Sequence, residues 1–165
     1  LWGYEQAGIE PDIMTLAKGL GGGVPIGAVL SKAHCAVFEP GDHGSTFGGN
    51  PLATAAGAYV LRQVIEGGVL QNAAARGEQL EKRLAAIEDR SELAVGHRGR
   101  GLLQGLVLQR DIAGEVVTRA LGHGLILNAV RPNTVRFMPP LTVTAEEIDE
   151  ATAIVERVLD EIAAS

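Results

Sequence analysis

The chain has 165 residues, enough for one domain with a hydrophobic core or for one and a half domains. Apolar residues make up 46% of it, which argues against disorder, and a formal net charge of −6 without a basic cluster argues against a nucleic-acid partner. No apolar run is long enough to cross a membrane. The chain has a single cysteine, Cys35, so it can form neither an internal disulfide nor a cysteine-based metal site. We expect Cys35 to be a small buried residue. This composition is typical of a cytoplasmic protein.

The first third of the chain predicts two short strands joined by a glycine-rich turn. Residues 13–17 are mostly apolar and predict a buried strand that ends at Lys18, and residues 28–30 predict a second strand. Residues 39–50 form a polar loop rich in Gly, Ser, Thr and Asp. A helix follows over 52–66, with Pro51 at its first position, and its Ala-rich, largely apolar sequence predicts that it is buried.

The remainder of the chain predicts a bridging helix and a compact α+β unit. The helix over 69–88 is amphipathic and could connect two domains. After a turn near 88–93, strands are expected at 102–108, 125–127 and 135–137, and helices at 112–121 and 145–163. Thr144 and Glu147 predict a capping box at the start of the last helix. We therefore expect three segments, at 1–68, 69–92 and 93–165.

Lys18 is the most informative residue of this pattern. It follows an apolar stretch and precedes four glycines within five residues, so no bulky side chain crowds its amine. Such a setting suits a lysine that forms an imine with an aldehyde, because the amine must move and must lose its proton readily. The alternative is a glycine-rich turn with an incidental lysine, and this segment alone leaves both interpretations open.

Two further features suggest binding of anions. Ser45 and Thr46 offer hydroxyl groups just before a predicted helix N-terminus, where phosphate groups commonly bind, although a plain surface loop with a helix cap has the same pattern. Arg136 lies in a half-buried predicted strand, where its planar guanidinium suits a ligand carboxylate. The alternatives are an ion pair within the protein and a side chain that extends to the surface. The four histidines are scattered without metal-ligand spacing, so no metal site is expected.

Four motifs in order resemble those of class III pyridoxal-phosphate aminotransferases. The segment 11–23, PDIMTLAKGLGGG, resembles the cofactor-lysine segment, and 43–51, HGSTFGGNP, resembles the phosphate loop that these enzymes contribute across their dimer. Residues 99–102, GRGL, and 135–141, VRFMPPL, resemble signatures of the small domain. Within the class, the details at 21–27 and 41–46 are most similar to the branch that acts on acetylornithine.

The resemblance implies an α/β fold of the type I pyridoxal-phosphate enzymes, with the chain forming the C-terminal part of the large domain and the small domain. It implies that Lys18 carries pyridoxal 5'-phosphate and transfers protons, and that Thr46 hydrogen-bonds the cofactor phosphate of the neighbouring subunit of a homodimer. Ser45 would lie beside the substrate, and Arg136 would bind the α-carboxylate of acetylornithine or of the acceptor 2-oxoglutarate.

The resemblance also implies what this chain lacks. Family members carry a longer N-terminal region with the acid that pairs with the pyridine nitrogen, and neither Asp12 nor Asp42 matches that motif. Because the sequence begins at Leu1, we expect a piece of a longer protein that is inactive alone. Ornithine, succinylornithine or 4-aminobutyrate aminotransferases remain alternatives, as does a non-catalytic partner that retains the fold.

Overall fold

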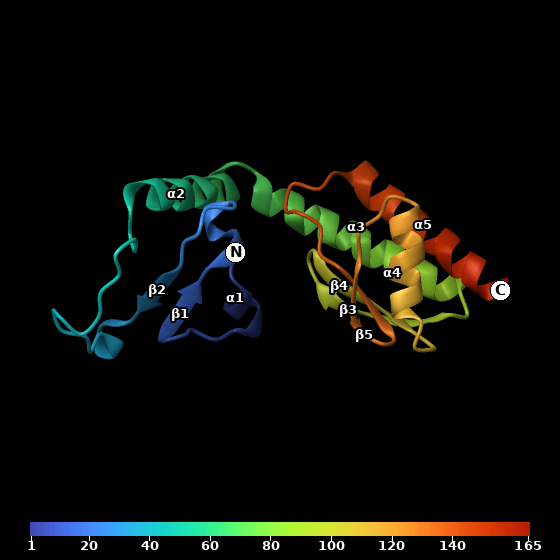
Figure 1. Cartoon of the computed structure of the whole chain (residues 1–165), viewed down its shortest axis with the longest axis horizontal. Helices are drawn as coiled ribbons and strands as arrows, with labels where there is room; N and C mark the ends of the chain where they lie inside the picture. The colour runs from blue at the N-terminus through green and yellow to red at the C-terminus, as the bar shows by residue number, and fades with distance from the viewer. The chain divides into compact units, whose positions relative to one another are not determined.

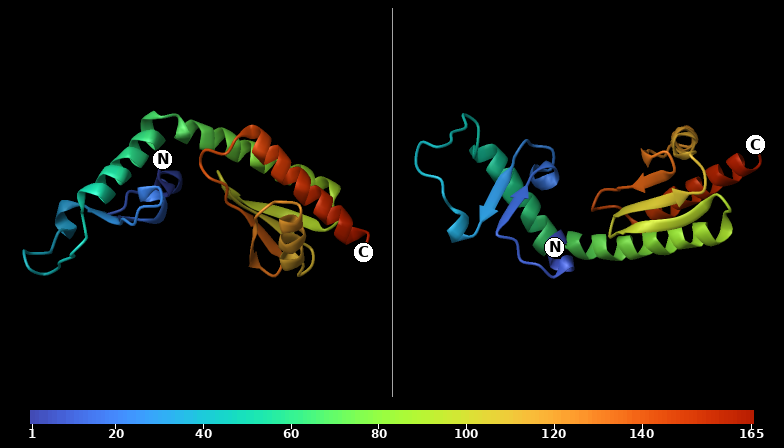
Figure 2. Two further views of the ribbon diagram at one scale, coloured as in Figure 1. Left: turned by 45° about the horizontal axis from the view of Figure 1, so that its top comes forward. Right: turned by 90° about the horizontal axis from the view of Figure 1, so that it is seen from below.

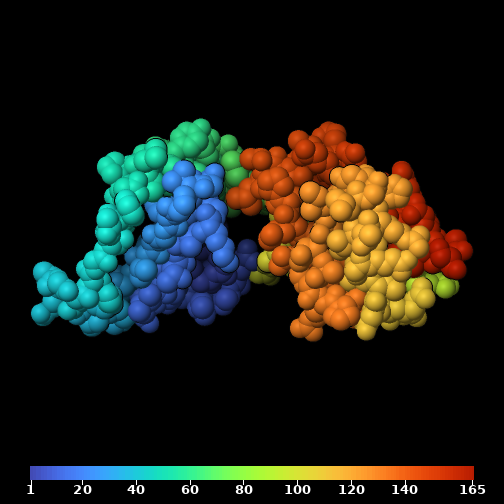
Figure 3. Space-filling model, in the orientation of Figure 1, coloured from blue at the N-terminus to red at the C-terminus, as the bar shows by residue number.

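The computed structural model describes residues 1–165 and divides into two compact units, Leu1–Val69 and Leu70–Ser165 (Figures 1 and 3). Each unit has its own set of helices and its own antiparallel sheet. The two are therefore described separately. No helix in either unit is both long enough and apolar enough to cross a membrane.

The first unit consists of a β-hairpin, short helical segments and one long helix. Its elements are α1 (Gly3–Ala7), β1 (Ile13–Leu16), the 3-10 turn η1 (Lys18–Gly21), β2 (Ala28–Ser31), the 3-10 turn η2 (Ala33–Cys35) and α2 (Pro51–Glu66). The strands β1 and β2 pair antiparallel, so the glycine-rich segment is the connection of a hairpin. This agrees with the two strands that the sequence predicts.

The helix α2 begins where the sequence predicts and packs against η1. The side-chain oxygen of Asn50 accepts a hydrogen bond of 3.0 Å from the amide of Ala53, which caps the helix. Gly57 lies next to the hairpin connection, and a Cβ there would make ordinary van der Waals contact with it, 3.6 Å from the carbonyl oxygen of Leu20. Gly57 and Val60 of α2 thus lie next to the lysine-bearing turn.

Burial in the first unit differs from the expectation. Only Gly21, Ala53 and Gly57 are buried, so the prediction of a buried strand before Lys18 and of a buried helix after Pro51 is wrong for this chain. The reason is that the hairpin and α2 cover little of one another and nothing else in the unit covers them. Large apolar side chains stay exposed at Ile13, Val29, Leu30, Val37, Phe38, Phe47, Leu52, Tyr59 and Ile65. Cys35 is half-buried and not fully buried as expected.

The second unit is a four-stranded antiparallel sheet with three helices (Figure 2). Its elements are α3 (Val69–Arg90), β3 (Ala94–Arg100), β4 (Leu103–Leu108), α4 (Ala113–Gly122), β5 (Asn128–Arg131), β6 (Thr134–Phe137) and α5 (Ala145–Ala163). The strand order is β3-β4-β6-β5. The expected helices and the capping box of Thr144 with Glu147 are confirmed.

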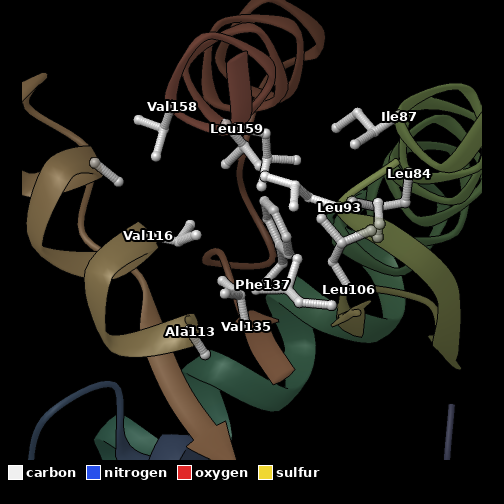
Figure 4. Packing of buried hydrophobic residues seen from close by; sticks show 14 of the residues in the cluster. Leu84, Ile87, Leu93, Leu106, Ala113, Val116, Val135, Phe137, Val158 and Leu159 are labelled. Atoms are coloured by element: carbon white, nitrogen blue, oxygen red, sulfur yellow. The ribbon is translucent and has the colours of Figure 1, made fainter. Parts of the chain in front are cut away.

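One face of this sheet packs against α3, α4 and α5 to form the core (Figure 4). Leu106 and Val135 project from the sheet towards Leu84 of α3, Val116 of α4 and Leu159 of α5, and all five are fully buried. Burying each such side chain contributes about 1.5–3 kcal/mol relative to leaving it exposed. Strand residues alternate between the two faces, so the neighbours of Leu106 and Val135 along their strands lie on the face away from this core.

Two strand predictions in this unit need correction. The apolar run Leu125–Leu127 was expected to be a strand, but it precedes β5, and Leu125 and Leu127 instead pack at the edge of the core. The strand β3 was not expected at all, because its sequence AVGHRGR lacks an apolar alternation. Pairing with β4, which contributes fully buried residues to the core, holds β3 in the sheet.

Candidate active site

Lys18 occupies an unusual backbone conformation directly after β1. Its φ angle of +54° makes it the only non-glycine residue of the chain with a positive φ. An L-residue in the left-handed region costs on the order of 1 kcal/mol or more, and such strain concentrates at functional sites. The side chain is exposed and forms no hydrogen bond or ion pair within the chain. A plain turn would place glycine here, so the conformation favours the functional interpretation of Lys18.

The glycines that follow Lys18 have structural reasons of their own. A Cβ on Gly21 would lie 2.8 Å from the Cγ2 atom of Ile26, and one on Gly22, which has a φ of +59°, would lie 3.1 Å from the Cγ2 atom of Val60. Packing within the connection therefore requires Gly21, packing against α2 and a positive φ favour Gly22, and the φ of +110° favours Gly23. Packing and backbone conformation thus explain Gly21, Gly22 and Gly23, whereas they do not explain the lysine at position 18.

The loop that leads into α2 is exposed from residue 36 to residue 49. Its last part is held by local hydrogen bonds, since the hydroxyl of Ser45 accepts a bond of 2.9 Å from the amide of Gly48 and the side chain of Asn50 donates one of 2.9 Å to the carbonyl of Phe47. The hydroxyl of Thr46 has no partner within the chain. The Thr46 hydroxyl is thus exposed and unpaired just before a helix N-terminus, where it could donate a hydrogen bond to an anion.

Arg136 lies in the middle of β6, on the sheet face away from the core. It is half-buried, and its buried Nε atom has no hydrogen-bond partner. The ion pair within the chain that the sequence left open is therefore not formed. The side chain borders an open cavity of about 340 Å³. The cavity is lined by Arg98, Gly99, Leu103, Gln104, Gly105, Val130, Thr134 and Arg136.

The structure thus places the predicted site residues in two groups. Lys18, Ser45 and Thr46 belong to the first unit, and no hydrogen bond joins Lys18 to the other two. Arg136 belongs to the second unit, and its cavity is formed wholly within that unit. Each group is therefore considered on its own geometry.

Sequence reasoning missed two features near Arg136. The first is Arg98, which lines the same cavity and lies in the unpredicted strand β3. The second is the structural requirement for glycine in the GRGL motif. Gly99 has a φ of +143°, and a Cβ on it would lie 2.2 Å from the carbonyl oxygen of Leu103. The buried amide of Gln104 donates bonds of 3.0 and 2.9 Å to the carbonyls of Gly77 and Gly101. The motif therefore builds a tight turn against α3.

The histidines take part in local contacts. The ring of His97 lies 2.7 Å from the Glu88 carboxylate, and the ring of His123 lies 3.0 Å from that of Glu161. His43 contacts the ring of Phe38 edge-on in the exposed loop. No group of three or more His, Cys, Asp or Glu side chains is arranged to hold a metal ion.

Comparison with known proteins defines the class. Residues 1–159 match the model of the family described as aminotransferase class-III, and the chain belongs to that family. The predicted fold class, that of the pyridoxal-phosphate aminotransferases, is confirmed by this match and by the structural likeness below. Which part of that fold the chain forms stays a prediction.

Particular relatives are acetylornithine and ornithine aminotransferases. The chain is 51% identical over 162 residues to acetylornithine aminotransferase of Caldanaerobacter subterraneus, covering 98% of this chain and 41% of the relative. The structure of acetylornithine aminotransferase from Elizabethkingia anophelis is similar with a TM-score of 0.87 at 30% identity, over 96% of this chain and 43% of that one. The ornithine δ-aminotransferase of Plasmodium falciparum gives a TM-score of 0.86 at 34% identity, over 95% and 42%. The chain thus spans about two fifths of the length of these relatives.

Proposed function

We propose that this chain is part of a cytoplasmic, homodimeric aminotransferase that moves the δ-amino group of N2-acetylornithine to 2-oxoglutarate in arginine biosynthesis. The observation that carries the proposal is Lys18, an exposed lysine in a left-handed conformation at the mouth of a glycine-rich turn. The 51% identity to an acetylornithine aminotransferase supports the choice of amino donor. The segments 1–68, 69–92 and 93–165 would be the end of the large domain, a linking helix and the small domain.

The residues of the first unit fit pyridoxal 5'-phosphate. When bound, that cofactor supplies an aldehyde for amines and a ring that withdraws electrons from the bonds of the attached carbon. The unpaired amine of Lys18 is free to bind the aldehyde, and glycines on its C-terminal side leave room for its movement. Once the amino group of the substrate has taken its place at the aldehyde, the released Nζ atom of Lys18 would accept a proton from the substrate carbon that bears the amino group, and would later donate one.

Ser45 and Thr46 have complementary roles in this proposal. The unpaired hydroxyl of Thr46 and the N-terminal end of α2 would hold the cofactor phosphate of the neighbouring subunit, since both present donors to an anion. The hydroxyl of Ser45 is already an acceptor from Gly48, which fixes its position while leaving its own proton free for a substrate atom.

Arg136 would bind the α-carboxylate of the donor or of the acceptor. Its unpaired guanidinium can offer two parallel N–H groups to a carboxylate, which fixes orientation as well as affinity. In the full-length enzyme, Arg136→Lys keeps the charge but loses the fork, so we expect substrate use to fall at least ~10-fold, on the order of 1.4 kcal/mol.

The central test is covalent trapping. The full-length protein is incubated with pyridoxal 5'-phosphate, reduced with borohydride, digested and analysed by mass spectrometry. We expect the adduct on Lys18 and its loss in Lys18→Ala. Lys32→Ala is the matched control, because Lys32 is engaged by Glu10 and Asp12 at 3.2 and 3.3 Å and should not react. An adduct on Lys32 or Lys82 in place of Lys18 would overturn the assignment.

The amino donor is tested by steady-state kinetics. Acetylornithine, ornithine, succinylornithine and 4-aminobutyrate are compared with 2-oxoglutarate as acceptor, and we expect the highest kcat/KM with acetylornithine. A different preferred donor would assign the enzyme to another branch of the family. Trapping at Lys18 without turnover of any donor would support the non-catalytic alternative.

The shared-site dimer is tested by subunit mixing. If Thr46 serves the partner's cofactor, a heterodimer of full-length Lys18→Ala and Thr46→Ala subunits has one site with both lesions and one with neither, so activity partly recovers. If the loop serves its own subunit, each site keeps one lesion and verified heterodimers remain as inactive as their parents.

A further inference from the structure

The few buried residues of the first unit lie beside the turn that carries Lys18. Gly21 belongs to the turn η1 itself, and Gly57 lies against that turn from α2. Ala53 is buried one helical turn before Gly57, on the same side of α2. Every other residue of the unit is at least partly exposed. The packing of this unit is therefore concentrated at one short element, which begins at Lys18.

Ile26 fills the space between this turn and the helix. Its Cγ2 atom lies 2.8 Å from the position that a Cβ on Gly21 would take, and its Cδ1 atom lies 3.4 Å from that of a Cβ on Gly57. One methyl group thus contacts η1 and the other contacts α2. Ile26 is half-buried, whereas many large apolar side chains of the unit are exposed. Its side chain therefore joins the two elements.

The backbone is anchored on both sides of Lys18. Leu16 pairs with Ala28 in the hairpin, and Leu20 packs against Gly57 of α2. The amide of Leu20 also donates a hydrogen bond of 3.2 Å to the carbonyl of Ala17, which closes the turn across Lys18. The connection between the two anchors has Lys18 at a φ of +54°. An L-residue keeps such a conformation only where its surroundings determine it.

We propose that Ile26 is a positioning residue for Lys18. By packing between η1 and α2, its side chain holds the turn against the helix and so keeps Lys18 in the left-handed conformation in which its amine is presented. Resting on the function proposed above, this assigns Ile26 an effect through the backbone of the turn. Without the full side chain, the turn can relax towards the negative φ that an L-residue prefers, and the amine is displaced.

The first measurement needs no cofactor. Lys18→Gly removes the cost of the left-handed conformation, whereas Lys18→Ala retains it. We follow urea unfolding of the 165-residue chain by the fluorescence of Trp2, its only tryptophan, which lies in the first unit. Lys18→Gly should have a higher midpoint than Lys18→Ala. Equal midpoints would show that the turn does not strain this residue, and would overturn the proposal.

The same pair of substitutions is then compared in an Ile26→Val background. Valine retains the methyl group that contacts Gly21 and lacks the Cδ1 atom that reaches Gly57. The two midpoints should now lie closer together, because the turn can relax. Effects of glycine on the unfolded chain are the same in both backgrounds and cancel in this comparison. An undiminished difference in the Ile26→Val background would contradict a role for Ile26.

Two more backgrounds sharpen this comparison. Ile26→Leu keeps the volume but lacks the Cγ2 atom that contacts Gly21, so it should also reduce the difference. Ile13→Val is the matched control, because Ile13 is exposed and lies at the opposite end of β1 from Lys18. It deletes the same methyl group and should leave the difference unchanged. A reduction as large in Ile13→Val would show general loosening of the unit and would overturn the specific role of Ile26.

The second measurement is the rate of cofactor attachment in the full-length protein. Samples taken after addition of pyridoxal 5'-phosphate are reduced with borohydride, and the adduct on Lys18 is quantified by mass spectrometry. Only molecules with the turn in its left-handed conformation react readily, so Ile26→Ala should slow attachment about fivefold or more. Ile26→Val should slow it less, and it provides the test if Ile26→Ala does not fold. An unchanged rate in folded Ile26→Ala would overturn the proposal.

The two measurements separate this inference from the proposed function. An adduct on Lys18 in the parent, without coupling between positions 26 and 18 in the urea midpoints, refutes only the role of Ile26. Coupling in the urea midpoints without any adduct on Lys18 refutes only the aminotransferase function.

Discussion

The two units of this chain differ in how they are stabilised. The first buries only three small residues and exposes many of its large apolar side chains, whereas the second encloses a continuous core of Leu, Val, Ile and Phe between a sheet and three helices. Yet Lys18, Ser45 and Thr46, which carry most of the proposed chemistry, lie in the first. Stability within this chain and the proposed cofactor chemistry are therefore concentrated in different units.

Truncation of leucines in the two units should give the largest contrast. Leu84 is fully buried in α3 and Leu52 is 74% exposed in α2. We expect Leu84→Ala to lower the free energy of unfolding by about 2–5 kcal/mol and Leu52→Ala to change it by less than about 0.5 kcal/mol. Urea unfolding followed by far-UV circular dichroism measures both. Equal losses would mean that Leu52 is covered in solution, for example by a second copy of the chain.

Glycines in helices of the second unit provide the next contrast. A Cβ on Gly77 of α3 would lie 2.6 Å from the Cα atom of Gly101, while one on Gly114 of α4 would meet nothing within 4 Å. Gly77→Ala should therefore cost about 1–3 kcal/mol through overpacking, despite the better helix propensity of alanine. Gly114→Ala should be neutral or stabilise by up to about 1 kcal/mol. The shift in the urea midpoint of each variant measures these effects. An unchanged midpoint for Gly77→Ala would show that the turn at Gly101 can move to accommodate the added methyl group.

Helix caps test whether the units unfold independently. The hydroxyl of Thr144 accepts a hydrogen bond of 3.2 Å from the amide of Glu147 at the start of α5, and Asn50 caps α2 in the first unit. Each substitution by alanine should cost about 1 kcal/mol. The only tryptophan, Trp2, reports on the first unit by fluorescence. If the units unfold independently, Asn50→Ala should lower the urea midpoint of the fluorescence transition alone. Thr144→Ala should lower only the midpoint of the later transition seen by circular dichroism. Equal shifts of both midpoints in either variant would indicate that the two units unfold as one cooperative unit.

The sequence predicts the elements whose signals are local. The apolar period of α3 and α5, the proline at the start of α2 and the capping box at Thr144 depend on residues within one or two turns, and the structure has these elements as expected. The strand β3 could not be predicted in this way, because its sequence is rich in Gly and Arg and only pairing with β4 makes it a strand. Burial of α2 was mispredicted because composition does not show which surfaces this chain covers.

The same distinction holds for the candidate site. Lys18 and the hydroxyls of Ser45 and Thr46 were found from short motifs, but the positive φ of Lys18 appears only in the structure. Arg136 was found from its apolar surroundings. Its neighbour Arg98 was missed because the two are 38 positions apart and meet only through the register of three strands. Long-range pairing is the information that local patterns do not contain.

The smallest predicted effect depends on pH and lies between α3 and α5. The Nε atom of Arg83 donates a hydrogen bond of 2.9 Å to the carboxylate of Asp149, and the amide of Gln79 donates one of 2.6 Å. The bond from Arg83, and then that from Gln79, hold the pKa of the Asp149 carboxyl below its usual range. A depressed pKa in the folded state stabilises the fold above the unfolded pKa of about 3.9, and this contribution is lost as the pH falls through the folded value.

Asp149→Asn should therefore be less stable than the parent at pH 7, by a small amount because the pair is exposed to solvent. The difference in urea midpoint should shrink as the pH is lowered below about 4, since the parent then loses the same charge. Glu156→Gln is the control, because its contact with Arg90 joins the same two helices over a longer 3.4 Å. A deficit of Asp149→Asn that stays constant down to the acid transition would assign it to lost hydrogen-bond geometry. A deficit that disappears on acidification would instead show that the charge of Asp149 is what links α3 to α5.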